Sequence, residues 1–198
     1  MAGPDASPTL KSPGAPATHH GGGLLMPYDG ILPTLGKDAY VAPNAVVIGN
    51  VAVGDRASIW FNCLIRGDGN YIRIGAETNL QDGTIIHISV RNGPTIIGER
   101  VTVGHGAIIH ACTIEDDSMI GIGAIVLDKA VVERGAVVAA GAVVPPGKVV
   151  KAREMWSGVP AQFTRPTKDS EIRFIARNAA HYVELAGTYL HPERQKKR

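Results

Sequence analysis

The chain has 198 residues, with 20 Lys and Arg against 18 Asp and Glu, a formal net charge of +2 at pH 7 and only two cysteines. So small a charge, on basic residues that are not interleaved with aromatic ones, argues against a nucleic-acid partner. No apolar run approaches the roughly 20 residues needed to cross a bilayer, so we expect no membrane segment. The length suits a single domain with a sizeable core.

The two ends of the chain differ in composition from its middle. Residues 1–26 are rich in Pro, Gly, Ala and Ser and have almost nothing apolar to bury, so we expect a disordered tail. This stretch has no arginine and no apolar h-region, which argues against a mitochondrial transit peptide and a secretory signal. Residues 191–198 are expected to form a solvated basic tail.

Between the tails, an aliphatic residue recurs at steps of six. A helix would need a period near 3.6 and a simple strand a period of 2, whereas a period of six suits a triangular coil with one hexad on each side. Three hexads make one turn, so eighteen hexads predict about six turns within residues 27–164. A β-sandwich with chance spacing is the alternative. The aliphatic positions are Val41, Val47, Val53, Ile59, Ile65, Ile74, Leu80, Ile86, Ile97, Val103, Ile109, Ile114, Ile120, Val126, Val132, Val138, Val144 and Val150.

This repeat resembles that of hexapeptide-repeat proteins. The resemblance implies an all-β solenoid, a left-handed parallel β-helix. The handedness comes from the resemblance alone, because the general crossover preference is right-handed. Cys63 and Cys112 occupy small inward positions of the repeat and are expected to be reduced core residues, which fits a cytoplasmic protein.

Beyond the coil, the Gly and Pro residues of segment 155–161 should turn the chain away. A helix is predicted over residues 165–190, with Thr167 as N-cap and the acids Asp169 and Glu171 in its first turn. It should pack along one side of the coil, where Tyr182 could reach a surface site. The apolar stripe at helical spacing consists of Ile172, Ile175, Ala176, Ala179, Val183 and Ala186.

The repeat assigns a position to two of the histidines. His87 follows Ile86 by one residue, and His110 follows Ile109 by one. The two lie one full turn apart once five extra residues are placed in an extruded loop, so they should stack roughly 4.8 Å apart, as neighbouring strands do. Arg66 has the same position one turn earlier. The loop is Ser89 to Thr95.

A third histidine belongs to a different column. His105 follows Val103 by two residues, and Asp82 has the same position one turn below. One subunit cannot easily direct both columns at a single metal, but two subunits side by side can, and threefold repetition closes a homotrimer with three sites. The same packing would place Arg66 opposite Asp82 of the neighbour.

Three neutral imidazoles with a fourth position open to water form the catalytic zinc arrangement. Such a metal lowers the pKa of its bound water to about 7 and generates hydroxide at neutral pH. The alternative is that each histidine is separately a surface or packing residue.

Residues 41–160 resemble the gamma-class carbonic anhydrase family in several short motifs. The resemblance implies that His87, His105 and His110 bind zinc, or Fe(II) or Co(II), across the trimer interface. The implied reaction is reversible hydration of carbon dioxide to bicarbonate by metal-bound hydroxide. The motifs are Arg66-Gly67-Asp68, Asn79-Leu80-Gln81-Asp82, His87 and Gly104-His105-Gly106-Ala107-Ile108-Ile109-His110.

The resemblance also implies roles for the neighbouring side chains. Gln81 would hydrogen-bond the hydroxide, and Asn79 would orient the groups around it. Tyr182 matches a tyrosine that approaches the metal pocket in the shorter relatives. Arg66, Asp68 and Asp82 would shape the interface.

Two departures bear on the rate. Gly69 stands where active members carry a glutamate, and the loop Ser89–Pro94 has no acid where theirs is acidic. Those glutamates relay protons, so metal binding is expected together with low turnover. Two other classes stay open: a hexapeptide-repeat acyltransferase with one histidine as base, and a non-catalytic assembly subunit.

Overall fold

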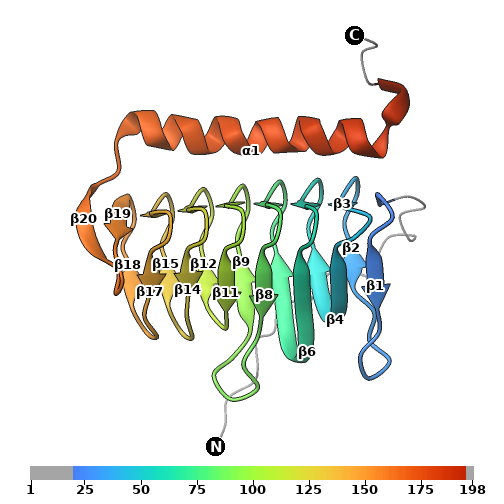
Figure 1. Ribbon diagram of the computed structural model, residues 1–198, viewed down its shortest axis with the longest axis horizontal. Helices are drawn as coiled ribbons and strands as arrows, with labels where there is room; N and C mark the ends of the chain where they lie inside the picture. The colour runs from blue at the N-terminus through green and yellow to red at the C-terminus, as the bar shows by residue number, and fades with distance from the viewer. Residues whose placement is uncertain (1–19, 195–198) are drawn as a thin grey trace, which may run out of the picture.

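The computed structural model describes residues 20–194 and shows a parallel β-solenoid with a long helix beside it (Figure 1). Each turn of the coil passes through three faces. The first face holds β1 (Leu24–Met26), the first half of β4 (Val46–Val53), the first half of β6 (Leu64–Ile74), β8 (Ile85–His87), β11 (Ile108–His110), β14 (Ile125–Val126) and β17 (Val143–Val144).

The other two faces follow in chain order. β4 and β6 bend from the first face into the second, because their halves pair with different neighbours. The second face adds β2 (Thr34–Leu35), β9 (Thr95–Ile97), β12 (Thr113–Ile114), β15 (Val131–Val132) and β18 (Val149–Val150). The third face holds β3 (Tyr40–Val41), β5 (Ser58–Ile59), β7 (Asn79–Leu80), β10 (Thr102–Val103), β13 (Met119–Ile120), β16 (Val137–Val138), β19 (Glu154–Ser157) and β20 (Gln162–Pro166).

The coil has about seven turns, one more than the six predicted. Seven strands of the third face run parallel, one in each turn, and β20 pairs with β19 in the antiparallel sense. The extra inward positions are Leu25, Leu35 and Trp156, which pair in register with Val47, Val53 and Val138. Leu35 and Trp156 keep the six-residue step from Val41 and Val150 but were not predicted as inward positions, and Trp156 is not aliphatic. Leu25 lies ten residues before Leu35 and so departs from the step.

The expected boundaries of the tails need correction where the structure describes them. The disordered tail was expected to reach residue 26, but Leu24–Met26 form β1 on the first face. Residues 1–19 of that tail lie outside the described part. At the other end Pro192–Arg194 form the 3₁₀ helix η1, and residues 195–198 lie outside the described part.

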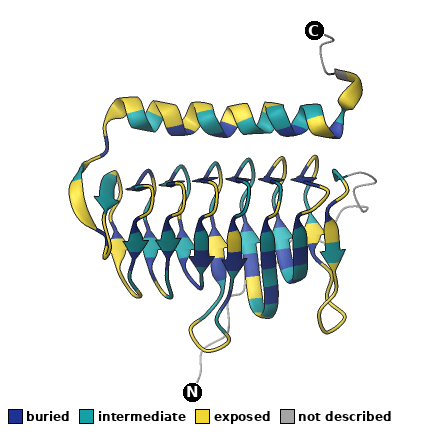
Figure 2. Ribbon diagram, in the orientation of Figure 1, coloured by how far each residue is buried: buried dark blue, intermediate teal, exposed yellow. Residues whose placement is uncertain are grey.

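The aliphatic repeat fills the interior of the coil, as predicted. The inward side chains from Val41 to Val150 are nearly all inaccessible to solvent, and Figure 2 shows buried segments on every turn. Burying a Val, Leu or Ile side chain contributes about 1.5–3 kcal/mol, so this column of aliphatic residues stabilises the coil. Because the aliphatic side chains occupy the interior, the polar side chains available for chemistry are on the outside of the coil.

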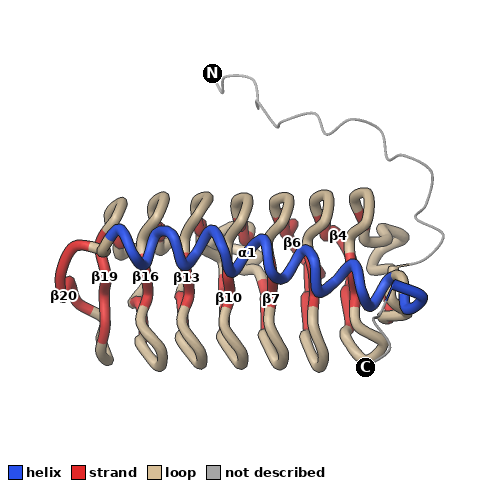
Figure 3. Tube along the Cα trace, turned by 90° about the horizontal axis from the view of Figure 1, so that it is seen from above, coloured by secondary structure: helices blue, strands red, loops and turns tan. Residues whose placement is uncertain are grey.

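Helix α1 (Asp169–Leu190) runs along the third face, over β7, β10, β13 and β16 (Figure 3). It is the only α-helix described in residues 20–194, and it is not long and apolar enough to span a membrane. Its buried residues are Ile175, Ala179, Ala186 and Leu190, while Ala176 of the predicted stripe is exposed.

The start of α1 differs from the prediction. The helix begins at Asp169 and not at residue 165, and its N-cap is Lys168. The backbone N–H of Lys168 donates to Glu171 Oε2 at 2.7 Å. Thr167 is buried instead of capping, because the chain first completes the β19–β20 hairpin. The Gly and Pro residues of segment 155–161 therefore make a hairpin turn after one more strand of the coil.

Five aromatic rings fasten the C-terminal half of α1 to the first turns of the coil. Trp60 packs against Tyr40, Tyr182 and Tyr189 with ring centroids 5.2, 5.3 and 5.4 Å apart, and Phe61 completes the cluster. Such pairs contribute about 0.5–1.5 kcal/mol beyond their buried area. This packing fixes the position of Tyr182.

Both cysteines are free and buried, as predicted. Burial raises the pKa of Cys63 and of Cys112 to about 12 each, so the reactive thiolate is scarce at neutral pH. We expect neither thiol to react with a disulfide reagent such as DTNB at pH 8 in the native protein. Both should react once the protein is unfolded in guanidinium. Rapid labelling of the folded protein would show that the coil opens locally at these turns.

Candidate metal centre

The first predicted column is confirmed by strand register. Arg66, His87 and His110 are paired partners on β6, β8 and β11 of the first face. Successive side chains of a strand alternate between its two sides, so His87 points outward as Ile85 does, while Ile86 fills the interior. The extruded loop is confirmed too, since β8 ends at His87 and β9 begins at Thr95.

Each of these two histidines is held by a carboxylate. His87 Nε2 lies 3.0 Å from Asp68 Oδ1, and His110 Nδ1 lies 2.5 Å from Asp128 Oδ1. An ionised carboxylate can only accept a hydrogen bond, so the ring nitrogen beside it must donate. A neutral imidazole has one N–H, and the other nitrogen of each ring therefore presents a lone pair.

Those two remaining nitrogens face one another. His87 Nδ1 and His110 Nε2 are 3.3 Å apart, with ring centroids 5.3 Å apart. Two facing lone pairs cannot hydrogen-bond to each other, because neither nitrogen carries a proton. They could instead both bind a metal cation placed between them. Nitrogens each about 2.0–2.1 Å from a tetrahedral zinc ion lie about 3.3–3.4 Å apart, so this spacing fits two ligands of such an ion.

The carboxylates are ionised in this arrangement. Burial raises the pKa of Asp68, but hydrogen bonds from Arg66 and His87 outweigh it and hold the pKa below its ordinary value. Burial likewise raises the pKa of Asp128, and hydrogen bonds from Asn92 and His110 outweigh it. Carboxylates that accept from the far nitrogen of a ligand imidazole fix its tautomer and raise its basicity.

Asp128 was missed in the sequence. Its signal was available, because it follows the inward residue Val126 by two, and Val126 pairs with Ile109 beside His110. Asp128 lies on the next turn and at a different hexad position from His110, so it belongs to neither predicted column. The repeat therefore located the histidines but not the carboxylate that orients one of them.

The second column is also confirmed. Leu80 pairs with Val103, and beyond them Gly106 N donates to Asp82 O at 2.8 Å. His105 Nδ1 lies 2.9 Å from Asp82 Oδ2, so Nε2 is the nitrogen left for a ligand bond, on a side chain that is 47% exposed. Gly104 lets the following turn pack closely, since a Cβ there would lie 2.7 Å from the backbone nitrogen of Ile122 on that turn.

One chain does not bring the two columns together. His105 lies in the turn before β11, and His110 is the last residue of that strand. Within residues 20–194, no three His, Cys, Asp or Glu side chains are close enough to hold one metal ion. The two columns are therefore separate within one chain, as the repeat predicted.

Gln81 and Asn79 lie beside the second column, beneath α1. Gln81 Nε2 donates to Asn79 Oδ1 at 3.2 Å, and Asn79 Nδ2 donates to Thr102 Oγ1 at 3.0 Å. Asn178 of the helix donates to the same hydroxyl at 3.1 Å. Asn79 has no exposed surface and Gln81 has 6%, so this chain of amides is held rigidly.

Tyr182 is on the same side of the molecule. Its ring packs edge-on against Trp60, and burial raises the pKa of its phenol, with the charge of nearby Asp82 raising it further. Tyr182 is therefore grouped with Asp82 and Gln81, and not with His87 and His110 of its own chain.

Arg66 and Asp68 form an ion pair within the chain. The predicted pairing of Arg66 with Asp82 of a neighbour stays a prediction, and both side chains are 41% exposed and accessible to a second copy.

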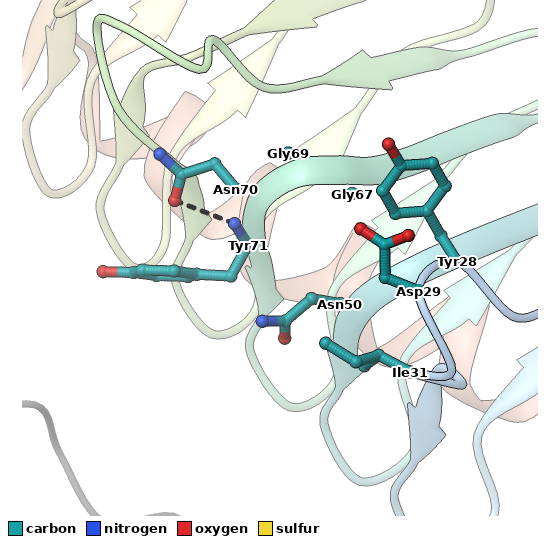
Figure 4. Close-up of a pocket in the computed structure, with 8 residues that line it drawn as sticks. All are labelled: Tyr28, Asp29, Ile31, Asn50, Gly67, Gly69, Asn70 and Tyr71. Atoms are coloured by element: carbon teal, nitrogen blue, oxygen red, sulfur yellow. Dashed lines mark hydrogen bonds between the residues drawn. The ribbon is translucent and has the colours of Figure 1, made fainter.

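A cavity of about 360 Å³ borders the segment that carries Asp68. Figure 4 shows Tyr28, Asp29 and Ile31 on one side of it, and Asn70 and Tyr71 at the bend of β6 on the other. Gly67 and Gly69, the two neighbours of Asp68, line it between them. Gly69 has no side chain, and a Cβ there would lie 2.7 Å from Val90 Cγ2 of the extruded loop.

The fold and these sites define a hexapeptide-repeat protein. A family model described as "Bacterial transferase hexapeptide (six repeats)" matches residues 33–67 and 111–146. The chain also resembles a solved structure described as a hexapeptide transferase family protein from Anaplasma phagocytophilum. The identity is 42% and the TM-score 0.81, covering 84% of this chain and 98% of the other.

Curated relatives are more specific. "Gamma carbonic anhydrase 2, mitochondrial" of Arabidopsis thaliana is 47% identical over 78% of this chain, and the match spans 57% of that protein's length. "Carbonic anhydrase" of Geobacillus kaustophilus is 42% identical over 84% of this chain and 91% of the relative. The chain belongs to the gamma-class carbonic anhydrase family.

Proposed function

We propose that this protein catalyses the reversible hydration of carbon dioxide to bicarbonate at a metal ion shared between two copies of a homotrimer. The observation that carries this proposal is the pair of facing nitrogens, His87 Nδ1 and His110 Nε2, 3.3 Å apart with a carboxylate behind each ring. His105 of a neighbouring copy would provide the third ligand. The similarity to proteins named carbonic anhydrase supports the reaction.

The surface around His87 and His110 supports the homotrimer. Six outward aliphatic side chains form a stripe on consecutive turns of the first face, beside the two histidines. A second copy that placed its His105 near His87 would cover this stripe. Covering it would remove apolar surface from water and so favour association. We call it the aliphatic stripe: Val46, Leu64, Ile85, Ile108, Ile125 and Val143.

The neighbouring copy would bring more than one ligand. Gln81, Asp82 and Tyr182 lie on the same side of the coil as His105, so they arrive at the site together. Ile122 stacks one turn above His105, with 59% of its surface exposed, and would meet the aliphatic stripe. A single contact between two copies would therefore bring together the metal ligands, the amide of Gln81 and the apolar surfaces.

A divalent metal held by His87, His110 and a neighbour's His105 would supply a hydroxide nucleophile near neutral pH, because it would lower the pKa of water. Imidazole nitrogens suit Zn, and also Fe(II) and Co(II). Gln81, already anchored through Asn79, presents its amide to orient the nucleophile. Because both amides are buried and hydrogen-bonded, this orientation would be set before carbon dioxide arrives.

The other two classes of function stay open to test. An acyltransferase needs one histidine as base, and it would not need two ring nitrogens facing each other with a carboxylate behind each. The solved relative described as a transferase shares the coil but does not by itself favour that chemistry. A non-catalytic assembly subunit would bind metal without hydrating carbon dioxide.

A cytoplasmic location is part of the proposal and rests on the two reduced, buried cysteines. The named Arabidopsis relative is mitochondrial.

The test of function is stopped-flow hydration of carbon dioxide by protein loaded with zinc, iron(II) or cobalt(II). Each hydration releases one proton, and this chain has glycine at position 69 and no acid in the Ser89–Pro94 loop to carry it away. We expect low turnover in dilute buffer and a steep rise as an imidazole-type buffer is added. High, buffer-independent turnover would mean that another relay exists.

A glutamate at position 69 should weaken this buffer dependence. Gly69→Glu alone would press on Val90, so the informative variant is Gly69→Glu with Val90→Ala. We expect higher turnover in dilute buffer, with the saturating rate less changed. Val90→Ala alone is the matched control. A double variant with the buffer dependence of the native chain would refute the role assigned to position 69.

A further inference from the structure

Asp128 is bonded on both of its carboxylate oxygens. Oδ1 accepts from His110 Nδ1 at 2.5 Å, and Oδ2 accepts from Asn92 Nδ2 at 2.8 Å. Its side chain is only 21% exposed, and its own carbonyl accepts from Gly147 N at 2.8 Å. The backbone of Asp128 is therefore held by Gly147, and its carboxylate bonds His110 with one oxygen and Asn92 of the extruded loop with the other.

Asn92 brings the extruded loop into this arrangement. Ser89 and Gly93 pair across the loop through two hydrogen bonds of 3.0 Å, and Ser89 Oγ accepts from Asn92 N at 3.1 Å. Those bonds set the loop in one shape and aim the Asn92 amide at Asp128. The end of the loop is tied as well, since Thr95 Oγ1 donates to His87 O at 2.5 Å.

We propose that Asp128 and Asn92 are positioning residues through which the extruded loop holds the His110 ring with Nε2 facing His87. The inference rests on the proposed function for the metal itself. The two oxygens of Asp128 have different partners, Asn92 for Oδ2 and His110 for Oδ1. If Asn92 did not hold Oδ2, the carboxylate could rotate away from His110 Nδ1. His110 could then carry its proton on Nε2, where it would oppose metal binding.

The first measurement needs no metal. In the metal-free full-length protein, ¹⁵N NMR of the imidazole rings should show the Nδ1–H tautomer for neutral His110. Asp128→Ala should move the ring toward the Nε2–H form, and Asn92→Ala should move it part of the way. A native His110 with its proton on Nε2 would overturn the proposal.

The second measurement is cobalt(II) affinity, followed by the visible absorption of the bound ion and by chelator competition. Residues that orient a ligand histidine typically change metal affinity 10–100-fold when removed, and we expect a loss of that size for Asp128→Ala. Asn92→Ala should cost less, and it should cost nothing further in the Asp128→Ala background, because both act through one carboxylate.

Controls separate positioning from folding. Asp128→Asn keeps the shape and one acceptor, so it should retain the fold by circular dichroism and bind cobalt with intermediate affinity. Asp117→Asn is the matched control, since Asp117 is also a half-buried, ion-paired aspartate but bonds Arg100 and Arg134. It should leave both readouts unchanged.

The outcomes distinguish this inference from the function on which it rests. A native protein with the expected tautomer that binds no cobalt would end the proposed function but not the positioning. Native cobalt affinity in Asp128→Ala would overturn the positioning while leaving the function intact. An Asn92→Ala penalty that persists in the Asp128→Ala background would overturn the part assigned to Asn92.

Discussion

His110→Ala should remove nearly all bound metal and, with it, carbon dioxide hydration. His110 Nε2 is one of the two nitrogens that face each other on the first face, and alanine leaves His87 as the only ligand in its column. Even removal of an outer partner of a ligand costs 10–100-fold in affinity, so loss of the ligand itself should cost more than about 100-fold. Metal content by atomic spectroscopy and stopped-flow rates measure both effects.

The control for this variant is His191→Ala. His191 lies at the C-terminal end of α1, where it pairs with Glu193, and it should be dispensable for both readouts. If the His110→Ala protein kept one metal per chain, the metal would have to be bound elsewhere and the proposed centre would be wrong.

Ile85→Glu should dissociate the trimer and empty the metal sites. Ile85 lies in the aliphatic stripe beside His87, and a trimer would bury the new carboxylate against apolar surface. An unpaired buried charge costs several kcal/mol, and it would occur at each of the three interfaces. Sedimentation equilibrium at micromolar concentration should show monomers.

Ile96→Glu provides a matched control. Ile96 also points outward from a short strand, with 37% of its surface exposed against 41% for Ile85, but it lies on the second face. It should stay trimeric and keep its metal. A trimer that survives Ile85→Glu and fails with Ile96→Glu would move the interface to the second face.

The fold was predictable to the extent that it follows from the hexad repeat. The inward column from Val41 to Val150 fixed the three faces and most of the register, and so put Arg66, His87 and His110 in one column. The prediction stopped short at both ends of the coil, because Leu25 departs from the six-residue step and Trp156 keeps the step but is not aliphatic. At both ends, pairing with the neighbouring strand of the coil places these residues inward.

The start of α1 shows a different limit. Thr167 is a good N-cap by residue type, but Thr167 belongs to the end of the β19–β20 hairpin and is buried. Capping preference acts on the order of 1 kcal/mol, and tertiary packing overrides it.

The positions of the three histidines on the coil were predictable from the repeat, and the residues that hold their rings were not. A column position depends only on the repeat, so His105 and Asp82 were placed correctly. The bond from Asp128 to His110 depends on side-chain reach between turns, and the bond from Asn92 depends on the shape of a loop outside the repeat. Neither follows from periodicity.

Subunit mixing tests the shared site most directly. Chains with His87→Ala have a damaged first column, and chains with His105→Ala have a damaged second column. Random reassembly of an equal mixture should restore about one quarter of the native metal content, because a site is intact only where a good first column meets a good second column. Mixing His87→Ala with His110→Ala should restore none, since both changes damage the same column. If the first mixture binds no more metal than its parents, or if both mixtures recover metal equally, the ligands are not shared between copies in this way.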